Sequence, residues 1–227
     1  MAQLGYNLMR IHHHDSGWVR PNIFDPAFND SRHLSASSLD ALDWWIKCLK
    51  DQGIYVWIDL HVGRVLMPGD RVRLGVDEIN RNGKEFNGFC YYNKELQSLM
   101  IGFQHSYLNH LNKYTSLRYK DDPAVMGVLL TNEDDLTVHQ GMGVLPDKNN
   151  PVHNALFTPL YKEFARQTGL AESKVFQIWL PGPGRMFSNE IEHRFNQTMI
   201  HDLRELGVRA PIATTNFWGN EIGRAHV

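Results

Sequence analysis

The chain has 227 residues, of which 42% are apolar, and a formal net charge of −2. This length can supply one sizeable core, and the near-neutral charge argues against electrostatic binding to nucleic acid. No apolar run approaches the roughly 18 residues of a membrane span, so no membrane partner is expected. The two cysteines, Cys48 and Cys90, do not make a disulfide framework. Because the first residues lack the features of a signal peptide, the chain as written is expected to be cytoplasmic.

Strand and helix patterns alternate in the first part of the chain, which is typical of α/β proteins with parallel strands. Residues 6–12 predict a first strand. Residues 39–49 keep the apolar spacing of a helix and follow two serines suited to capping it. Residues 54–60 are nearly all apolar or β-branched, as in a buried parallel strand. The charged, glycine-rich residues 63–92 are predicted to be a long loop.

The alternation continues in the second part of the chain. Residues 93–114 predict a helix, and residues 124–131 predict a third strand after an Asp-Asp-Pro break. Helical patterns cover residues 154–168 and 189–206, and residues 211–215 predict a last strand. The sequence therefore predicts an α/β fold with parallel strands.

Three of the predicted strands end in polar side chains that are able to do chemistry. They are Arg10, His12 and His14 at the end of the first strand, Asp59 and His61 at the end of the second, and Asn132 and Glu133 at the end of the third. In a parallel barrel the carboxyl ends of the strands meet at one mouth, where catalysis takes place. We therefore expect these side chains to gather around one site.

The sequence at these strand ends resembles that of clan A glycoside hydrolases, the group that includes the family 5 cellulases. The similar segments are Gly5-x-Asn7-x-x-Arg10 (second strand of that clan), Ile58-Asp-Leu-His61 (third) and Thr131-Asn132-Glu133 (fourth, introduced by Asp122-Pro-Ala-Val). Residues 207–216 resemble the approach to the fifth strand. The resemblance covers about residues 4–220. It implies an incomplete (β/α) TIM barrel with about half of the eight parallel strands, and a partial domain over residues 1–220.

The resemblance also implies a reaction, retaining hydrolysis of β-linked glycosides. One carboxylic acid protonates the glycosidic oxygen and a second carboxylate about 5–5.5 Å away attacks the sugar. Glu133 would be the acid/base, Asn132 would bond the sugar 2-hydroxyl, Arg10 would steady the nucleophile, and His61 would line a subsite. The expected partner is an oligo- or polysaccharide or a small glycoside, without a cofactor. In the clan the nucleophile is a glutamate on the seventh strand, and no residue here matches its motif.

Further side chains are candidates for sugar contacts. They are His12, His14, Trp18, Trp179 and Trp218, for which packing is the alternative role. His12 and His14 alternate onto one face of an extended chain, and with His61 they would make a three-histidine zinc site. A metal-dependent hydrolase is therefore an alternative function, although we favour a site without a metal.

The ends of the chain bear on its state of assembly. Residues 221–227 are expected to be a non-native tail, because a widely used sequencing adapter encodes Ile222-Gly-Arg-Ala-His-Val227 in one frame. The first barrel strand is expected to be missing, which leaves secretion of an intact parent protein open. A half barrel exposes two strand edges and its inner layer, so a homodimer or higher homo-oligomer is predicted. A non-catalytic, self-associating fragment is the third hypothesis for function.

Overall fold

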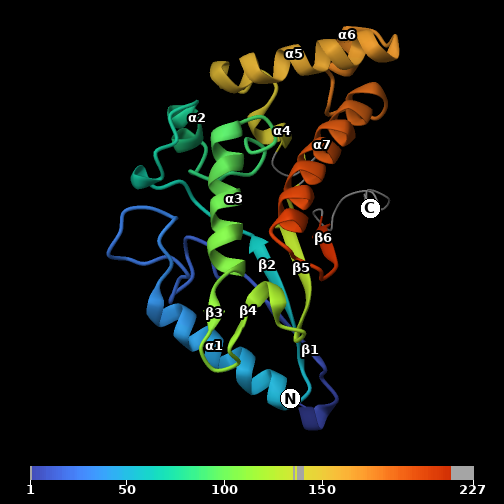
Figure 1. The fold of residues 1–227 in the computed structure, drawn as a ribbon. Helices are drawn as coiled ribbons and strands as arrows, with labels where there is room; N and C mark the ends of the chain where they lie inside the picture. Colours follow the sequence, from blue (N-terminus) through green and yellow to red (C-terminus); the bar gives the residue numbers. More distant parts are fainter. Residues whose placement is uncertain (1, 135, 137–140, 216–227) are drawn as a thin grey trace. The chain divides into compact units, whose positions relative to one another are not determined.

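The computed structural model describes residues 2–134, 136 and 141–215 of the chain (Figure 1). The chain divides into two compact units. The first comprises Met1–Asp70, Leu99–Asn132 and Met199–Thr214. The second comprises Arg71–Ser98, Glu133–Thr198 and Thr215–Val227.

The first unit is built around a sheet of four strands in the order β1-β2-β5-β6. The strands are β1 (Leu8–Ile11), β2 (Tyr55–His61), β5 (Val125–Asn132) and β6 (Ile212–Thr215). β1 pairs with β2 and β2 with β5 in parallel, with Arg10 opposite Trp57 on the first two strands. This arrangement confirms the predicted incomplete (β/α) barrel, because a complete barrel closes eight such strands into a ring.

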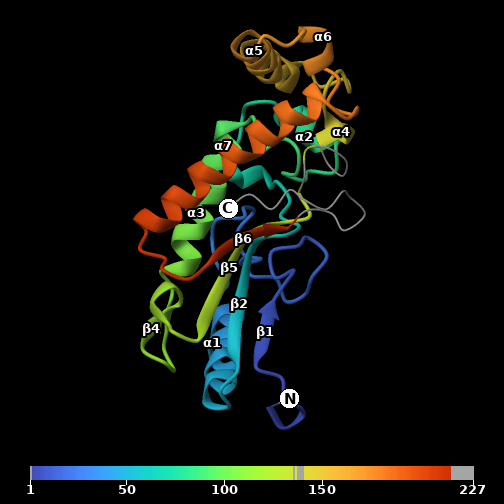
Figure 2. The same ribbon diagram turned by 90° about the vertical axis from the view of Figure 1, so that its right-hand side faces the viewer.

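Helix α1 (Ala36–Asp51) lies against β2 (Figure 2). It begins after Ser35, whose hydroxyl accepts a hydrogen bond from the Ser38 N–H at 3.2 Å. The buried apolar residues of the helix recur at helical spacing and are Leu39, Leu42, Ile46 and Leu49. The fully buried apolar residues of β2 are Val56, Ile58 and Leu60. These two sets form the core of the first unit and hold the strands in their register.

The helix predicted over residues 93–114 ends earlier than expected. Helix α3 spans Lys94–Leu108. An antiparallel hairpin of β3 (Leu111–Asn112) and β4 (Leu117–Arg118) follows it. The apolar periodicity that predicted a longer helix therefore continued into a different element.

The side chain of Asn112 accounts for this change of structure. Its oxygen accepts hydrogen bonds from the N–H groups of Tyr114 and Thr115 at 2.9 and 3.2 Å, which closes a turn. Its amide donates to the carbonyl of Asp43 on α1 at 3.0 Å. Such bonds offer the backbone an alternative to continuing the helix.

Helices predominate in the second unit. They are α2 (Val76–Arg81), the start of α3, α4 (Gly141–Val144), α5 (Pro151–Thr168), α6 (Glu172–Val175) and the first part of α7 (Pro183–Glu205). Helix α2 lies inside the stretch predicted to be a loop, so that prediction was wrong there. Phe157 is fully buried in this unit, with its ring 5.8 Å from that of Tyr92 and 5.6 Å from that of Phe187. Of the helices in the described part of the chain, none combines the length and apolar character needed to cross a membrane.

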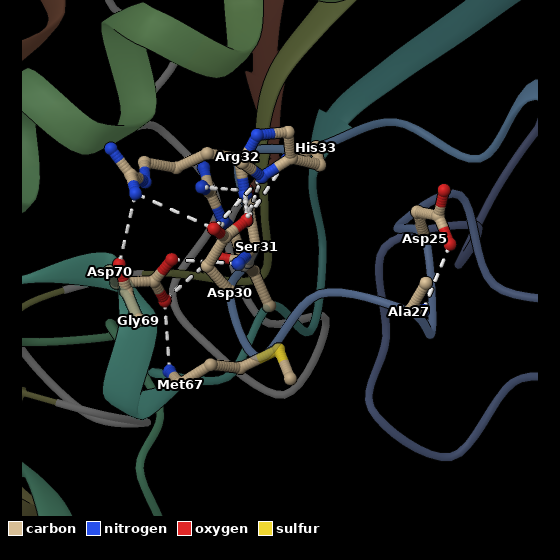
Figure 3. A network of polar contacts seen from close by, with 10 residues as sticks. Asp25, Ala27, Asp30, Ser31, Arg32, His33, Met67, Gly69 and Asp70 are labelled. Atoms are coloured by element: carbon tan, nitrogen blue, oxygen red, sulfur yellow. Dashed lines mark hydrogen bonds and ion pairs between the residues drawn. The ribbon is translucent and has the colours of Figure 1, made fainter.

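A polar network joins the segments that follow β1 and β2 in the first unit (Figure 3). Asp30 accepts hydrogen bonds from the N–H groups of Arg32 and His33 at 2.9 and 3.0 Å, and contacts the His33 ring at 2.8 Å. Desolvation raises the pKa of Asp30, but these bonds outweigh it and bring the pKa down to about 2. Arg32 also donates to the carbonyl of Gly69 at 3.1 Å. The network fixes loops near the carboxyl ends of the strands.

Candidate active site

The carboxyl ends of β1, β2 and β5 bring Arg10, Asp59 and Asn132 together. Arg10 Nε donates to both carboxylate oxygens of Asp59, at 3.1 and 2.8 Å. Arg10 Nη2 donates to Asn132 Oδ1 at 2.7 Å. The Asp59 side chain is completely buried, whereas that of Arg10 is 43% exposed. A buried carboxylate is stable only when it is paired and hydrogen-bonded, so Asp59 fixes the guanidinium in one orientation at the solvent boundary.

His12 joins this cluster through the same carboxylate. Its Nδ1 makes a short hydrogen bond with Asp59 Oδ2, and its side chain is 29% exposed. Asp59 therefore bridges the two side chains, Arg10 and His12, that reach solvent at this strand end. The sequence placed Asp59 among the polar residues at the strand ends but gave it no specific role.

The segment after β1 leaves the strand conformation at His13. This residue has a φ of 58°, in the left-handed region that few residues other than glycine adopt. Its ring lies 3.9 Å from that of His12 and 4.9 Å from that of Trp18, and its Nδ1 is 2.9 Å from Ser16 Oγ. Trp18 is 72% exposed. The three rings form a partly exposed aromatic row, and a sugar contact by Trp18 remains a prediction.

His14 and His61 face the interior of the first unit. The ring of His14 lies 5.0 Å from that of Tyr107, and the ring of His61 lies 5.6 Å from that of Phe103. His61 Nε2 is also 3.2 Å from the side-chain amide of Gln104. Burial lowers the pKa of His14 from 6.5 to about 4 and holds that of His61 well below 6.5. Both rings are therefore neutral at neutral pH.

The geometry of the described residues does not support the alternative zinc site of His12, His14 and His61. Across residues 2–134, 136 and 141–215, no group of three or more His, Cys, Asp or Glu side chains is arranged to hold a metal ion. The prediction assumed that His12 and His14 share one face of an extended chain. The strand ends at Ile11 and the left-handed turn at His13 breaks the alternation, so His12 bonds Asp59 while His14 packs inside.

Glu133 opens the second unit, one residue after Asn132. Its φ is 53°, again in the left-handed region. Its N–H donates to the carbonyl and the hydroxyl of Thr215 at 2.8 and 3.2 Å, and the residue is half-buried. Strained backbone of this kind persists only where surrounding bonds impose it, and it clusters at functional sites.

Asp134 anchors the chain directly after Glu133 and was not identified from the sequence. It is buried, and its carboxylate accepts hydrogen bonds from the Gly88 N–H at 3.2 Å and the Cys90 thiol at 3.3 Å. Burial, together with the negative charge of Asp134, holds the pKa of the Cys90 thiol well above its usual value. Tyr91 donates its phenolic hydrogen to the Asp134 carbonyl. The signal was the unusual Glu-Asp-Asp run at a strand end.

The two remaining tryptophan candidates lie away from the Arg10 cluster in sequence. Trp179 belongs to the second unit, is 42% exposed and has its ring 5.9 Å from that of Phe176. Trp218 and the predicted tail at residues 221–227 lie outside the described residues.

Comparisons with known proteins give the class of fold. No protein-family model and no curated protein sequence matches the chain. An endo-β-1,4-mannanase structure from Thermotoga petrophila matches 98% of this chain and 39% of its own, with a TM-score of 0.52 and 14% identity. A second mannanase structure from this organism, with maltose and glycerol, matches 98% of this chain and 51% of its own. Its TM-score is also 0.52 and its identity is also 14%.

A family 5 mannosidase structure from Rhizomucor miehei matches with a TM-score of 0.43 and 16% identity. The mannanase likenesses show the fold alone, which is an incomplete barrel of the type that these two mannanases have. The chain spans about half or less of the length of the two mannanases.

Proposed function

We propose that the chain is part of a retaining glycoside hydrolase that acts on β-linked oligo- or polysaccharides, with Glu133 as its acid/base. The observation that carries the proposal is the Arg10–Asp59–Asn132 cluster at the carboxyl ends of three adjacent parallel strands. Catalytic groups of barrel enzymes come from these strand ends. Glu133 follows Asn132 directly and has the strained backbone that is frequent at such sites.

In this proposal each residue has one task. Glu133 protonates the glycosidic oxygen and later activates water. Asn132 accepts a hydrogen bond from Arg10 through Oδ1, which orients its amide as a donor toward the sugar 2-hydroxyl. Arg10 presents a fixed positive charge beside the place where a carboxylate nucleophile would stand.

The nucleophile is not assigned to any residue of this chain. A retaining pair acts as a unit, so turnover by the chain alone is expected to be weak or absent unless a second carboxylate is brought in by self-association. The two Thermotoga petrophila structures named above are endo-β-1,4-mannanases, so β-1,4-mannotetraose is the first substrate to try, with cellotetraose and aryl β-glycosides beside it.

Glu133→Gln tests the acid/base role. Whatever turnover of mannotetraose the chain has should fall by roughly 10²–10⁴-fold, because general-acid catalysis contributes that much. Aryl glycosides with good leaving groups need less protonation and should lose less. Glu85→Gln removes an exposed glutamate from the same unit and serves as the matched control. An unchanged rate on mannotetraose would remove Glu133 from the mechanism.

A further inference from the structure

The buried carboxylate of Asp59 determines which nitrogen of His12 carries a proton. A carboxylate only accepts hydrogen bonds, so the short contact between Asp59 Oδ2 and His12 Nδ1 requires a proton on Nδ1. In the neutral ring Nε2 then carries a lone pair and is a hydrogen-bond acceptor. In the described part of the chain the side chain of His12 has a hydrogen bond at Nδ1 and none at Nε2, and it is 29% exposed.

The His12 ring is held from a second side as well. It lies 3.9 Å from the ring of His13, which is fixed in turn by Ser16 and by the left-handed backbone at that position. The ring therefore has little freedom to rotate away from Asp59. Orientation by one carboxylate and one packed ring is the usual way in which a histidine is pre-organised for a ligand.

Arg10 and His12 present complementary hydrogen-bonding groups side by side. The guanidinium offers N–H donors, and the imidazole offers an acceptor at Nε2. Both are bonded to the same buried carboxylate, and both reach solvent. A neighbouring donor and acceptor match two adjacent hydroxyl groups of a sugar ring, one as acceptor and one as donor.

We propose that Asp59 is a positioning residue that holds His12 in its Nδ1–H tautomer, so that His12 Nε2 accepts a hydrogen bond from a carbohydrate hydroxyl beside Arg10. The identity of the ligand as a carbohydrate rests on the proposed function. The tautomer and its dependence on Asp59 rest on geometry alone.

The first experiment is ¹⁵N-detected NMR of the full chain at pH 8, to assign the tautomer of His12. We expect a protonated Nδ1 and an unprotonated Nε2. In Asp59→Asn the single amide oxygen will pair with Arg10, which can only donate, and the NH₂ group will face His12 Nδ1. The proton should then move to Nε2, as in other His–Asp pairs that are changed to His–Asn.

Asp202→Asn is the matched control, because Asp202 contacts His105 at 3.0 Å in the same unit. It should leave the His12 signals unchanged. A wild-type His12 protonated at Nε2, or an Asp59→Asn variant that keeps the wild-type tautomer while folded, would overturn the positioning role.

The second experiment measures binding of mannotetraose and cellotetraose by NMR titration. His12→Ala should weaken binding roughly tenfold, the usual effect of losing one hydrogen bond to a ligand. His12→Gln should restore part of the loss, since its side-chain oxygen can accept, and the exposed His201→Ala is the control. Asp59→Asn should bind as weakly as His12→Ala, because the switched tautomer presents a donor.

The outcomes separate the two proposals. If the wild-type chain binds the sugars and His12→Ala binds them equally well, the sugar-accepting role of His12 is wrong and the proposed function stands. If the wild-type chain binds neither sugar at millimolar concentration, the carbohydrate ligand is wrong for both proposals, and the tautomer experiment alone decides the role of Asp59.

Discussion

Asp70 and Ser31 are joined by two hydrogen bonds, from the Ser31 N–H at 2.7 Å and from its hydroxyl at 2.8 Å (Figure 3). Asp70 is 6% exposed and also accepts a bond from the Met67 N–H at 2.8 Å. One buried carboxylate therefore ties the segment after β1 to the segment after β2. Arg64 donates to the same Ser31 hydroxyl at 2.9 Å, so this hydrogen-bond network also includes a buried cation.

Asp70→Ala should destabilise the first unit. It leaves the two buried donors of Ser31 and the partly buried N–H of Met67 without an acceptor, and each buried group costs about 1–3 kcal/mol. We expect a total loss of about 2–5 kcal/mol in the free energy of unfolding, measured by urea denaturation. Asp121→Ala, at an exposed position, is the control and should change stability by less than about 0.5 kcal/mol. Equal urea midpoints for the two variants would contradict a stabilising role for the hydrogen bonds of Asp70.

Two glycine-to-alanine substitutions should change the stability of the fold in opposite directions. A Cβ at Gly127 on β5 would lie 2.3 Å from the ring of Trp57 on β2, so Gly127→Ala must displace the ring and should cost about 1–3 kcal/mol. A Cβ at Gly102, in the middle of α3, meets nothing within 4 Å. Gly102→Ala should therefore stabilise by about 0.5–1 kcal/mol through helix propensity.

Thermal melts of both glycine variants check this pair, together with tryptophan fluorescence for the displaced ring. A Gly127→Ala protein as stable as the wild type would show that Trp57 moves aside without cost.

Stability should fall as the pH is lowered from about 7 to 4. Burial lowers the folded-state pKa of His14 to about 4, and those of His61 and His153 also lie below 6.5. In this window the unfolded chain binds protons that the folded chain does not, so acid favours unfolding. For His14 alone, lowering the pKa from 6.5 to about 4 corresponds to at most about 3.4 kcal/mol of unfolding free energy.

The variant His14→Phe tests whether protonation of His14 causes the loss of stability in acid. Phenylalanine can pack beside Tyr107 and cannot be protonated, so the dependence of unfolding free energy on pH should become shallower between pH 6.5 and 4. Denaturation curves at a series of pH values measure the slope. The same slope in wild type and variant would assign the acid sensitivity to other groups.

We expect the chain to self-associate. Within the described residues β1 is an edge strand of the sheet, and apolar side chains of the strands are exposed: Leu8 is 41%, Tyr55 50% and Met126 39% exposed. An open edge and a bared apolar face favour association, and a two-fold dimer is the simplest closed solution. Sedimentation at micromolar concentration should show a dimer or a higher oligomer.

Tyr55→Lys should weaken that association, because it places a charge on the bared face, whereas Lys84→Gln at an exposed loop position should not. A stable wild-type species of 26.2 kDa, the mass of one chain, would contradict the prediction.

The sequence alone was sufficient for the strands of the core and for the cluster of Arg10 with Asn132. Unbroken apolar and β-branched runs such as that of β2 predict buried parallel strands, and parallel strands place their carboxyl ends together whatever the details of packing. Arg10, Asp59 and Asn132 at those ends are therefore neighbours. Helix α1 was equally predictable, because its cap and its apolar spacing are local properties.

Only the tertiary structure determined which residues His12 and His14 contact. Alternation along a strand placed His12 and His14 on one face, but the strand stops at Ile11 and the left-handed residue His13 turns the chain. His12 then reaches Asp59, while His14 packs against Tyr107, and both contacts join residues far apart in the sequence. The hairpin after α3 has a similar cause, because it depends on the bond from Asn112 to α1. Local periodicity carries no information about such partners, which exist only once the distant elements have packed.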